Sequence, residues 1–191
     1  MNKKIGLIGE DPNDTNSLKN LLLQKYEGSI SFVQLLKNQR GHQLENLRTK
    51  VALKIEFAEK KPNLLIVIRD ADAIVTEAQK LTKRKDWYKS LVDGITNKSM
   101  FLLIIYELES WIIADINTFN KIYNTKINFK KNIHYFKDPK GFLKEKTRNN
   151  NKKYKESDAP DLFKKLSFNT IKSNCTVFNK FIKDFESAIN K

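Results

Sequence analysis

Apolar runs of strand length alternate, from residue 3 to about residue 116, with segments whose apolar residues recur at helical spacing. The runs predict strands at residues 3–9, 29–36, 64–68 and 100–106. The last two are continuously apolar, which is typical of strands buried on both faces. Because strands and helices alternate, the pattern predicts an α/β fold, a Rossmann-like and mostly parallel sheet covered by helices.

A helix is expected after each strand. Asp11 and Pro12 are residue types preferred just before and at the start of a helix, and Gly28 marks the end of the first one. An apolar stripe at residues 44–60 predicts the second helix, which Pro62 ends. A third is expected from about residue 74, and the segment ESWIIADI predicts a fourth.

The chain changes character after residue 116. Residues 117–157 are rich in Asn, Lys and aromatic residues and have a loop-like composition. The tail from Ala159 again shows helical spacing. We expect residues 1–116 to form the α/β core, and residues 117–191 to form a basic, helical extension packed on the same body as part of one structural domain.

Charge changes this picture by pointing to a kind of partner. The 191 residues include 36 Lys or Arg and 22 Asp or Glu, a formal net charge of +14. Such an excess favours polyanionic partners, usually nucleic acid, although a lysine-rich proteome would give the same composition. Residues 121–155 hold twelve Lys or Arg against two acids, so the predicted extension carries much of the excess.

Cysteine usage and hydropathy bear on the compartment. Cys175 is the single cysteine, so no internal disulfide is possible, and a reducing compartment such as the cytoplasm is expected. The first residues show no signal-peptide pattern, and no apolar run reaches the roughly 18 to 20 residues that span a membrane. We therefore expect a cytoplasmic protein that is not inserted in a membrane.

Acidic residues follow three of the four predicted strands. They are Glu10 with Asp11 and Asp14, then Asp70 and Asp72, then Glu107 and Glu109. Because the carboxyl ends of parallel strands share one edge of the sheet, these acids should converge. Crowded carboxylates raise one another's pKa unless a cation neutralises them, and carboxylate oxygens suit Mg²⁺ or Mn²⁺. The sequence therefore predicts a divalent metal site at this edge.

Each acid also has a structural explanation. Asp11 suits the N-cap position, and Asp14 suits the first turn of a helix, where negative charge is favourable. Glu107 and Glu109 share a face only if the strand geometry continues, and of the two we expect Glu109 to be the ligand. Trp111, just beyond it, is expected in the core.

Four segments in this order resemble the TOPRIM domain, which occurs in topoisomerases, bacterial primases and nucleases of the overcoming-lysogenization-defect family. They are GEDPNDT, VIRDADA, ELESWIIADI and KYKESDAPDLFKKL. The last two are similar to segments of a small, uncharacterised bacterial TOPRIM-like family. The pattern departs from the usual form at one point, because Asp11 follows the lead glutamate where glycine is usual, and Gly9 precedes it.

The resemblance implies a TOPRIM nuclease, that is, metal-dependent hydrolysis of phosphodiester bonds in nucleic acid. It implies that Glu10, Asp70 and Asp72 hold Mg²⁺ or Mn²⁺ and that Asp14 and Glu109 complete a second position. Glu10 could instead act as the acid/base. The chain lacks the tyrosine-bearing domain of a topoisomerase and the accessory domains of a primase, so hydrolysis by water is the favoured reaction.

Basic residues complete this interpretation. Lys155 is a candidate for stabilising transition-state charge, with Lys153 as the alternative. Candidates for contact with nucleic-acid phosphates are Arg40, His42, Lys152 and Lys153. Aromatic residues of the basic region could stack on unpaired bases or belong to the core; they are Tyr123, Phe129, Tyr135, Phe136 and Tyr154.

Other interpretations stay open at this stage. TOPRIM-like proteins often act beside an ATPase, and since this chain has no glycine-rich Walker A loop, an ATPase would be a separate partner. An effector role in bacterial defence against phage, a homo-oligomer, and a non-catalytic adaptor subunit are further possibilities. A phosphoaspartyl receiver-like domain would use Asp70 as phosphoacceptor and a lysine after a fifth strand.

Overall fold

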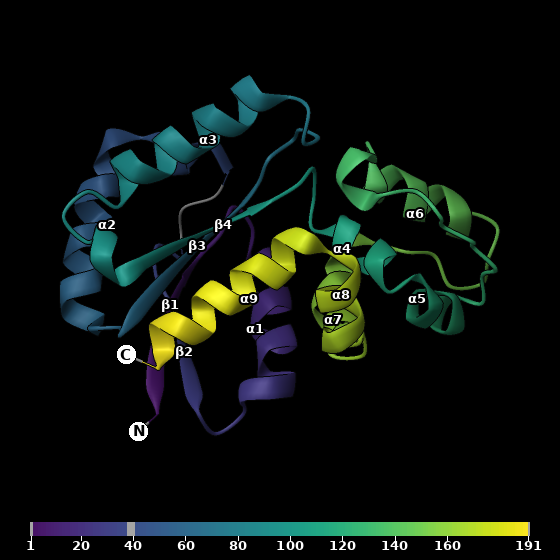
Figure 1. Ribbon diagram of the computed structural model, residues 1–191, viewed down its shortest axis with the longest axis horizontal. Helices are drawn as coiled ribbons and strands as arrows, with labels where there is room; N and C mark the ends of the chain where they lie inside the picture. Colours follow the sequence, from purple (N-terminus) through teal and green to yellow (C-terminus); the bar gives the residue numbers. More distant parts are fainter. Residues whose placement is uncertain (1, 38–40, 191) are drawn as a thin grey trace.

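A computed structural model describes residues 2–37 and 41–190 of the chain, with the side chain of His42 left out. Within this part the strands form a four-stranded parallel sheet in the order β2-β1-β3-β4 (Figure 1). The strands are β1 (Lys3–Ile8), β2 (Ile30–Gln34), β3 (Leu64–Asp70) and β4 (Ser99–Ile104). The predicted α/β class with a parallel, helix-covered sheet is therefore confirmed.

One face of the sheet is covered by α1 (Pro12–Tyr26) and by the C-terminal helices α7 (Ala159–Phe163), α8 (Phe168–Asn174) and α9 (Thr176–Ile189) (Figure 1). We call it the α1 face. Ile66 and Ile68 of β3 point to this face and share a core with Leu18 of α1 and Phe178 of α9. The tail thus supplies apolar surface to the same core as the first strand and helix.

The opposite face is covered by α2 (Leu47–Lys60) and α3 (Ala78–Leu91), and we call it the α3 face (Figure 1). Leu65 and Val67 of β3 point to it and pack with Leu53 of α2 and Leu91 of α3. The third helix thus begins four residues later than the sequence predicts. Residues 71–77 form the loop between β3 and α3, and this loop lies at the predicted site.

The helical stripe in residues 44–60 located α2 correctly, yet much of it faces solvent. Leu47, Val51 and Ile55 are 84%, 59% and 54% exposed. Leu53 and Thr49 are instead the buried residues of α2. Spacing therefore identified the helix, and packing against β3 determined which side is buried.

The turn from β1 to α1 explains the unusual order of residues around Glu10. Asp11 is the N-cap, with extended backbone (φ −133°, ψ 147°), and its side chain accepts a hydrogen bond of 2.7 Å from the Asn13 N–H. An extended residue needs no glycine. Gly9 is required instead by close packing, because a Cβ there would lie 2.8 Å from Cγ2 of Thr15. The departure from the TOPRIM pattern therefore leaves a regular helix start.

Residues 116–158 form a side lobe beyond the carboxyl ends of the strands (Figure 1). It contains α5 (Ile116–Tyr123) and α6 (Pro139–Thr147) and is joined to the sheet by α4 (Glu109–Ala114). The loop-like composition of residues 117–157 therefore concealed two α-helices.

The short 3-10 helices of the described residues are Gly41–Glu45, Thr96–Lys98, Ile133–Tyr135 and Glu156–Asp158.

Aromatic residues of the lobe form its core. Tyr123 is 1% and Tyr154 is 3% exposed, and both pack against Phe119. The sequence-based option that these two tyrosines stack on bases is therefore wrong, since a buried ring offers no face to a ligand. Phe129 and Phe136 also pack together, and Tyr135 is the exposed member of the set. Trp111 is buried, as expected.

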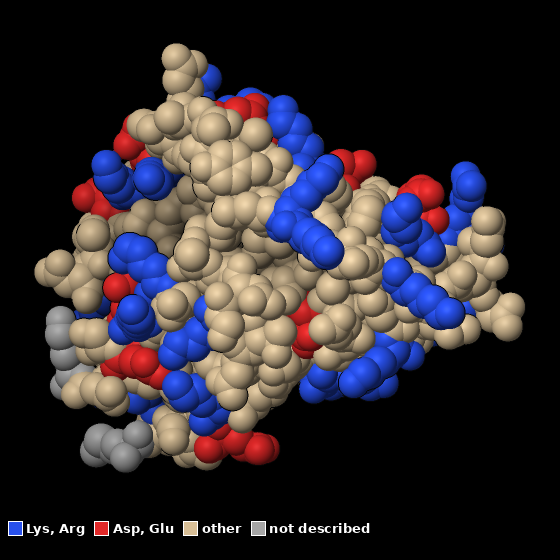
Figure 2. Space-filling model, turned by 45° about the vertical axis from the view of Figure 1, so that its right-hand side comes forward, with Lys and Arg blue, Asp and Glu red and all other residues tan. Residues whose placement is uncertain are grey.

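Charged side chains of both signs occur on the face shown in Figure 2. Lys and Arg side chains are spread over much of this face, with acidic side chains between them. On this face the basic residues therefore do not form a single stripe. In residues 2–37 and 41–190, no helix is both long enough and apolar enough to cross a membrane.

Candidate carboxylate site

The three predicted acidic segments meet at the carboxyl edge of the sheet. Glu10 follows β1, Asp70 ends β3, and Glu109 is the first residue of α4 after β4. From β1 the chain leaves through α1 on one face, and it returns to β3 through α2 on the other. In open parallel sheets, ligands bind outside the strands at such a switch point. The edge between β1 and β3 is therefore the expected binding position.

Asp70, at the end of β3, has one carboxylate oxygen that the protein encloses. Its atom Oδ1 is shielded from solvent and accepts no hydrogen bond within the described part of the chain. Burial raises the pKa of this carboxyl well above its usual range, and the negative charges of Asp14 and Glu109 raise it further. A buried acceptor without a partner is costly, so this oxygen is suited to receive a ligand.

Asp14 faces Asp70 from the first turn of α1. Burial raises its pKa from 3.8 to about 7, and the charges of Asp11, Glu10 and Glu109 add to the rise. The Asp11 N–H, which donates to Oδ2 of Asp14 at 3.2 Å, acts in the opposite direction. Asp14 thus completes the helix cap and is also part of the acidic site.

Glu109 approaches from α4 and is 5% exposed. The Tyr154 hydroxyl donates to its Oε1 at 3.0 Å. Burial raises the pKa of Glu109, while the positive charge of Lys140 opposes the rise. The phenol thus holds this carboxylate in place, whereas Nζ of Lys140 lies 3.3 Å from Oε2 of Glu156 and acts on Glu109 through its charge.

Glu107 diverges from Glu109, because α4 begins between them. Its Oε2 accepts a hydrogen bond of 3.2 Å from the Lys140 N–H. Burial raises the pKa of Glu107 to about 7, and Glu109 contributes to the rise. Glu107 thus faces the start of α6, which agrees with Glu109 being the closer partner of Asp70.

The remaining two acids are held by arginines. Nε of Arg69 lies 2.5 Å from Oε1 of Glu10, and Arg84 lies 2.8 Å from Oδ2 of Asp72. Glu45 joins the two arginines, at 2.6 Å from Arg69 and 3.1 Å from Arg84. The pKa of Glu10 is still raised, because burial outweighs the attraction of Arg69. These groups form a continuous chain of opposite charges.

Strand alternation explains why the acids divide in this way. Successive side chains of a strand point to opposite faces, so Asp70 follows Ile66 and Ile68 to the α1 face. Arg69 follows Leu65 and Val67 to the α3 face, where its guanidinium lies 4.4 Å from the ring centre of Trp87. Neighbouring residues of one strand therefore serve two different clusters.

The loops after β3 and β4 are tied to each other. The Asp72 N–H donates to the Tyr106 carbonyl at 3.1 Å, and the Tyr106 N–H donates to the Ala73 carbonyl at 3.0 Å. Both Asp72 (φ 49°) and Tyr106 (φ 61°) adopt left-handed backbone, which is uncommon for residues other than glycine. Such local strain is common at functional sites, where neighbouring structure holds it in place.

A divalent cation fits this site by its chemistry. The donors are carboxylates, and one buried oxygen of Asp70 is without a partner in the described part of the chain. Within residues 2–37 and 41–190, no three His, Cys, Asp or Glu side chains already converge as the ligands of one ion. Glu10 and Asp72 are turned toward Arg69 and Arg84 instead. Binding would therefore require side chains to rotate inward.

Among the described residues, no ion pair joins Lys152, Lys153 or Lys155 to the carboxylates of the site. Lys152 is placed over the Tyr123 ring, 4.7 Å from its centre. The Lys155 backbone N–H donates to Asp158, and the charge that opposes the pKa rise of Glu109 comes from Lys140. Lys153 is exposed. Arg40 and the side chain of His42 lie outside the described residues.

Sequence reasoning missed Arg69, Arg84, Glu45 and Lys140. The pairing of Arg69 could have been predicted, because this residue directly follows the apolar run LLIVI, and a charged residue in a buried strand is usually paired. Arg84 lies on the same helix face as Trp87, one turn earlier, so it too could have been placed near β3. Glu45 and Lys140 carried no such signal, because their positions beside the site depend on tertiary contacts.

Comparisons with known proteins place this arrangement in a family. The family model described as "Domain of unknown function (DUF4276)" matches residues 9–186. This range includes every carboxylate and arginine of the site. No curated protein and no solved structure matches the chain. The chain belongs to the DUF4276 family of domains of unknown function.

Proposed function

We propose that the protein hydrolyses phosphodiester bonds of nucleic acid with the help of Mg²⁺ or Mn²⁺. The observation that carries the proposal is the group Asp14, Asp70 and Glu109, three carboxylates at the switch point of a parallel sheet that form no ion pair within the described residues. Because no ion pair offsets their negative charge among the described residues, a bound cation would stabilise them. The formal charge of +14 elsewhere suits a polyanionic substrate.

The residues would divide the work as follows. Asp14, Asp70 and Glu109 would hold the ion, and Glu10 and Asp72 would join them after leaving Arg69 and Arg84. The bound ion would lower the pKa of a water molecule and stabilise charge on the phosphate. Glu10, whose pKa is raised by burial, is suited to accept the proton of the attacking water.

Lys140 takes the role that the sequence suggested for Lys155. Burial alone would lower the pKa of Lys140, but the charges of Glu109, Glu107 and Glu156 outweigh this effect and raise it, so this ammonium group stays protonated at neutral pH. Its positive charge opposes the rise in the pKa of Glu109. A phosphate that bridges the site would meet this lysine, which could stabilise the negative charge of the transition state.

The test is a cleavage assay with plasmid, single-stranded DNA and RNA in Mg²⁺ or Mn²⁺. The wild type is compared with Asp70→Asn and with a matched control, Asp93→Asn. Asp93 is an exposed acid near the amino end of β4 that pairs with Lys50. We expect metal-dependent cleavage by the wild type and the control and none by Asp70→Asn. Equal cleavage by both variants would contradict the proposal.

A second candidate function is a nucleic-acid-binding adaptor without catalysis. The pairing of Glu10 and Asp72 with arginines favours it, because a fully neutralised pair binds metal less readily. It predicts binding of nucleic acid that is unaffected by Asp70→Asn, with no cleavage in any divalent metal. A receiver-like role is less favoured, because the sheet of the described residues has four strands, and the lysine would follow a fifth.

The TOPRIM resemblance, an ATPase partner and a role in defence against phage remain predictions. The order of the acidic segments and their meeting at one sheet edge support the resemblance, and the other two predictions depend on it. Co-purification of the chain with its genomic neighbours would test the partner, and a plaque assay with Asp70→Asn would test the defence role.

A further inference from the structure

The first half of α3 presents a basic face beside the carboxylate site. Lys80, Lys83, Arg84 and Trp87 are spaced three or four residues apart, so they share one side of the helix. Together with Asp72, Ala71 and Glu45 they line a pocket of about 420 Å³. The pocket thus joins three cations and an aromatic ring to one of the acids expected to hold metal.

The cations of this face differ in how strongly they are engaged. Arg84 bridges Glu45 and Asp72, and Lys80 pairs with Glu77 at 2.8 Å. Lys83 is exposed and forms no ion pair in the described residues. An exposed, unpaired ammonium group at the rim of a pocket is available to an anionic ligand at little desolvation cost.

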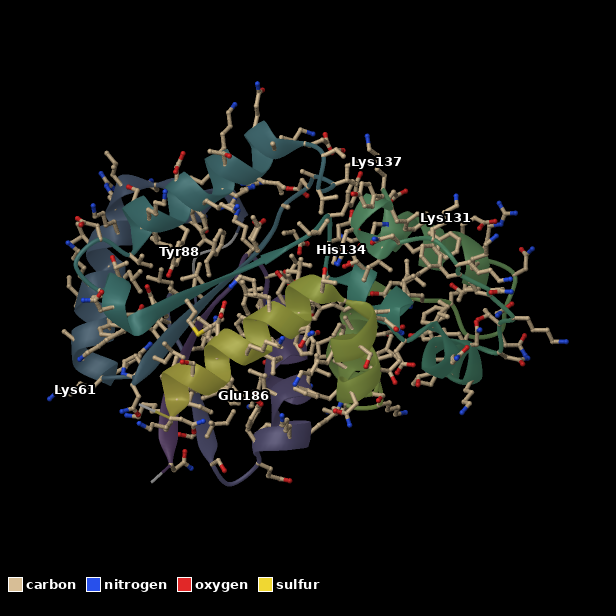
Figure 3. The ribbon with its side chains drawn as sticks, in the orientation of Figure 1. Lys61, Tyr88, Lys131, His134, Lys137 and Glu186 are labelled. Carbon is tan, nitrogen blue, oxygen red and sulfur yellow. The ribbon has the colours of Figure 1, made fainter. Side chains whose placement is uncertain are left out.

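The side lobe contacts the loop that precedes α3. The Val75 N–H donates to the His134 carbonyl at 3.2 Å, which ties the loop before α3 to the lobe. Lys137 contributes to the lowered pKa of Glu77, after the larger effects of Lys80 and of the Ile74 N–H. Figure 3 shows Lys137 at the edge of the lobe nearest this loop, and Lys61 far away at the other end of the molecule.

We propose that the α3 pocket, lined by Lys80, Lys83, Arg84 and Trp87, binds one nucleotide of a single-stranded nucleic acid next to the carboxylates. The inference rests on the proposed function and names its substrate class. The volume lies at the small end of ligand pockets, which suits one nucleotide. A flexible single strand can put a phosphate on the lysines and a base on the indole, whereas a duplex keeps its bases stacked inside.

The experiment measures binding, so it does not depend on cleavage. A fluorescent 12-nucleotide oligothymidylate is titrated by anisotropy without divalent metal, using the wild type, Lys83→Glu and the matched control Lys98→Glu. Lys98 is an exposed lysine directly before β4, at the opposite edge of the sheet. Circular dichroism melting confirms that each variant is folded. We expect Lys83→Glu to weaken binding about tenfold, and Lys83→Gln to lower the salt-dependence slope by about 1.

Equal affinities of Lys83→Glu and Lys98→Glu would overturn the inference, and so would a duplex competitor that displaces the strand as well as a single-stranded one does. The proposed hydrolase is tested separately. If the wild type binds the strand but never cleaves it, and Lys83→Glu loses binding, the inferred nucleotide pocket is supported and the proposed hydrolase is contradicted. If the wild type cleaves and Lys83→Glu behaves like the control, the reaction stands and the pocket is wrong.

Discussion

The carboxyl edge of the sheet carries acids on both of its faces, and the two groups are treated differently. On the α3 face, Glu10 and Asp72 are matched by Arg69 and Arg84, with Glu45 between the arginines. On the α1 face, Asp14, Asp70 and Glu109 have no arginine beside them among the described residues. In the first group every carboxylate has a guanidinium partner, and the formal charge of its three acids and two arginines is only −1. The second keeps an electrostatic cost that protonation or a bound cation would remove.

The comparison shows that arginines offset the charge of one set of acids and leave the other set without an ion pair among the described residues. Clustered acids with strongly raised pKa values are unusual in purely structural positions and frequent at functional sites. Under the proposed function, the acids held by arginines would exchange partners when a cation or a phosphate binds. The predictions below test each half of this comparison, from the largest effect to the smallest.

The largest effect is expected from Asp70→Asn on the unpaired side. We expect cleavage to fall by on the order of 10³-fold or more, which corresponds to about 4 kcal/mol of transition-state stabilisation. The same change should raise the free energy of unfolding of the metal-free protein above pH 7, because the amide does not repel Asp14 and Glu109. Denaturant melts with EDTA measure this, and loss of both activity and stability would indicate simple misfolding.

On the paired side, Arg69→Met should destabilise the fold. Arg69 is 3% exposed, and its removal leaves the buried Glu10 carboxylate without its partner. Breaking a buried ion pair typically costs about 3–5 kcal/mol, and the contact with Trp87 is lost as well. The double variant Arg69→Met/Glu10→Gln should recover part of that loss. Urea unfolding curves report both, and an unchanged midpoint for the single variant would count against the pairing.

Stability should fall as pH rises when metal is absent. The folded-state pKa of Asp14 is about 7, above its ordinary 3.8, so the folded protein binds more protons than the unfolded one between these values. The favourable protonation is complete below about pH 4 and is lost as pH rises through 7, at about 1.4 kcal/mol per pKa unit. Glu107 acts with the same sign.

The control for this prediction is Asp14→Asn, which can still accept the Asp11 N–H. Buried His134, whose pKa is lowered, destabilises the fold at low pH, but it does so equally in both proteins. We expect the wild type to lose more stability than Asp14→Asn between pH 5 and pH 8, and Mg²⁺ to restore more of it at pH 8. Parallel melting curves for the two proteins would show that Asp14 is not the source.

The smallest effect is expected from the basic loop. Lys152 lies over Tyr123, and Lys153 is exposed, so Lys152→Gln/Lys153→Gln should change cleavage and strand affinity by less than about threefold. Lys140→Gln, by contrast, should reduce cleavage by about tenfold or more, because this ammonium group faces Glu107 and Glu109. The reverse order of effects in a cleavage assay would support the sequence-based prediction that Lys152 and Lys153 contact nucleic-acid phosphates.

Much of the fold followed from patterns that involve few residues. Each apolar run is a local feature, and parallel strands bring their carboxyl ends together, so the convergence of Glu10, Asp70 and Glu109 could be predicted. Which face of each helix is buried could not be predicted. Leu47, Val51 and Ile55 of α2 recur at the same spacing as the apolar residues of α9, yet the first set is exposed and Phe178, Phe181 and Phe185 are buried.

Which charged residues form ion pairs could not be predicted from the sequence, for a related reason. Arg69 is next to Asp70 in sequence, but the strand sends the two side chains to opposite faces, where different helices meet them. Glu45, Lys140 and Tyr154 reach the site from three segments that are far from Asp70 in the sequence. Which acid receives an arginine therefore depends on contacts between distant parts of the chain.

The most direct test of the account is to measure Mn²⁺ binding by electron paramagnetic resonance or calorimetry at pH 7.5. The wild type is compared with Asp70→Asn on the α1 face and Glu45→Gln on the α3 face. We predict that the wild type binds Mn²⁺, that Asp70→Asn loses this binding, and that Glu45→Gln retains it. Equal binding by the wild type and Asp70→Asn, or no binding by the wild type, would contradict the claim that the unpaired carboxylates form a metal site.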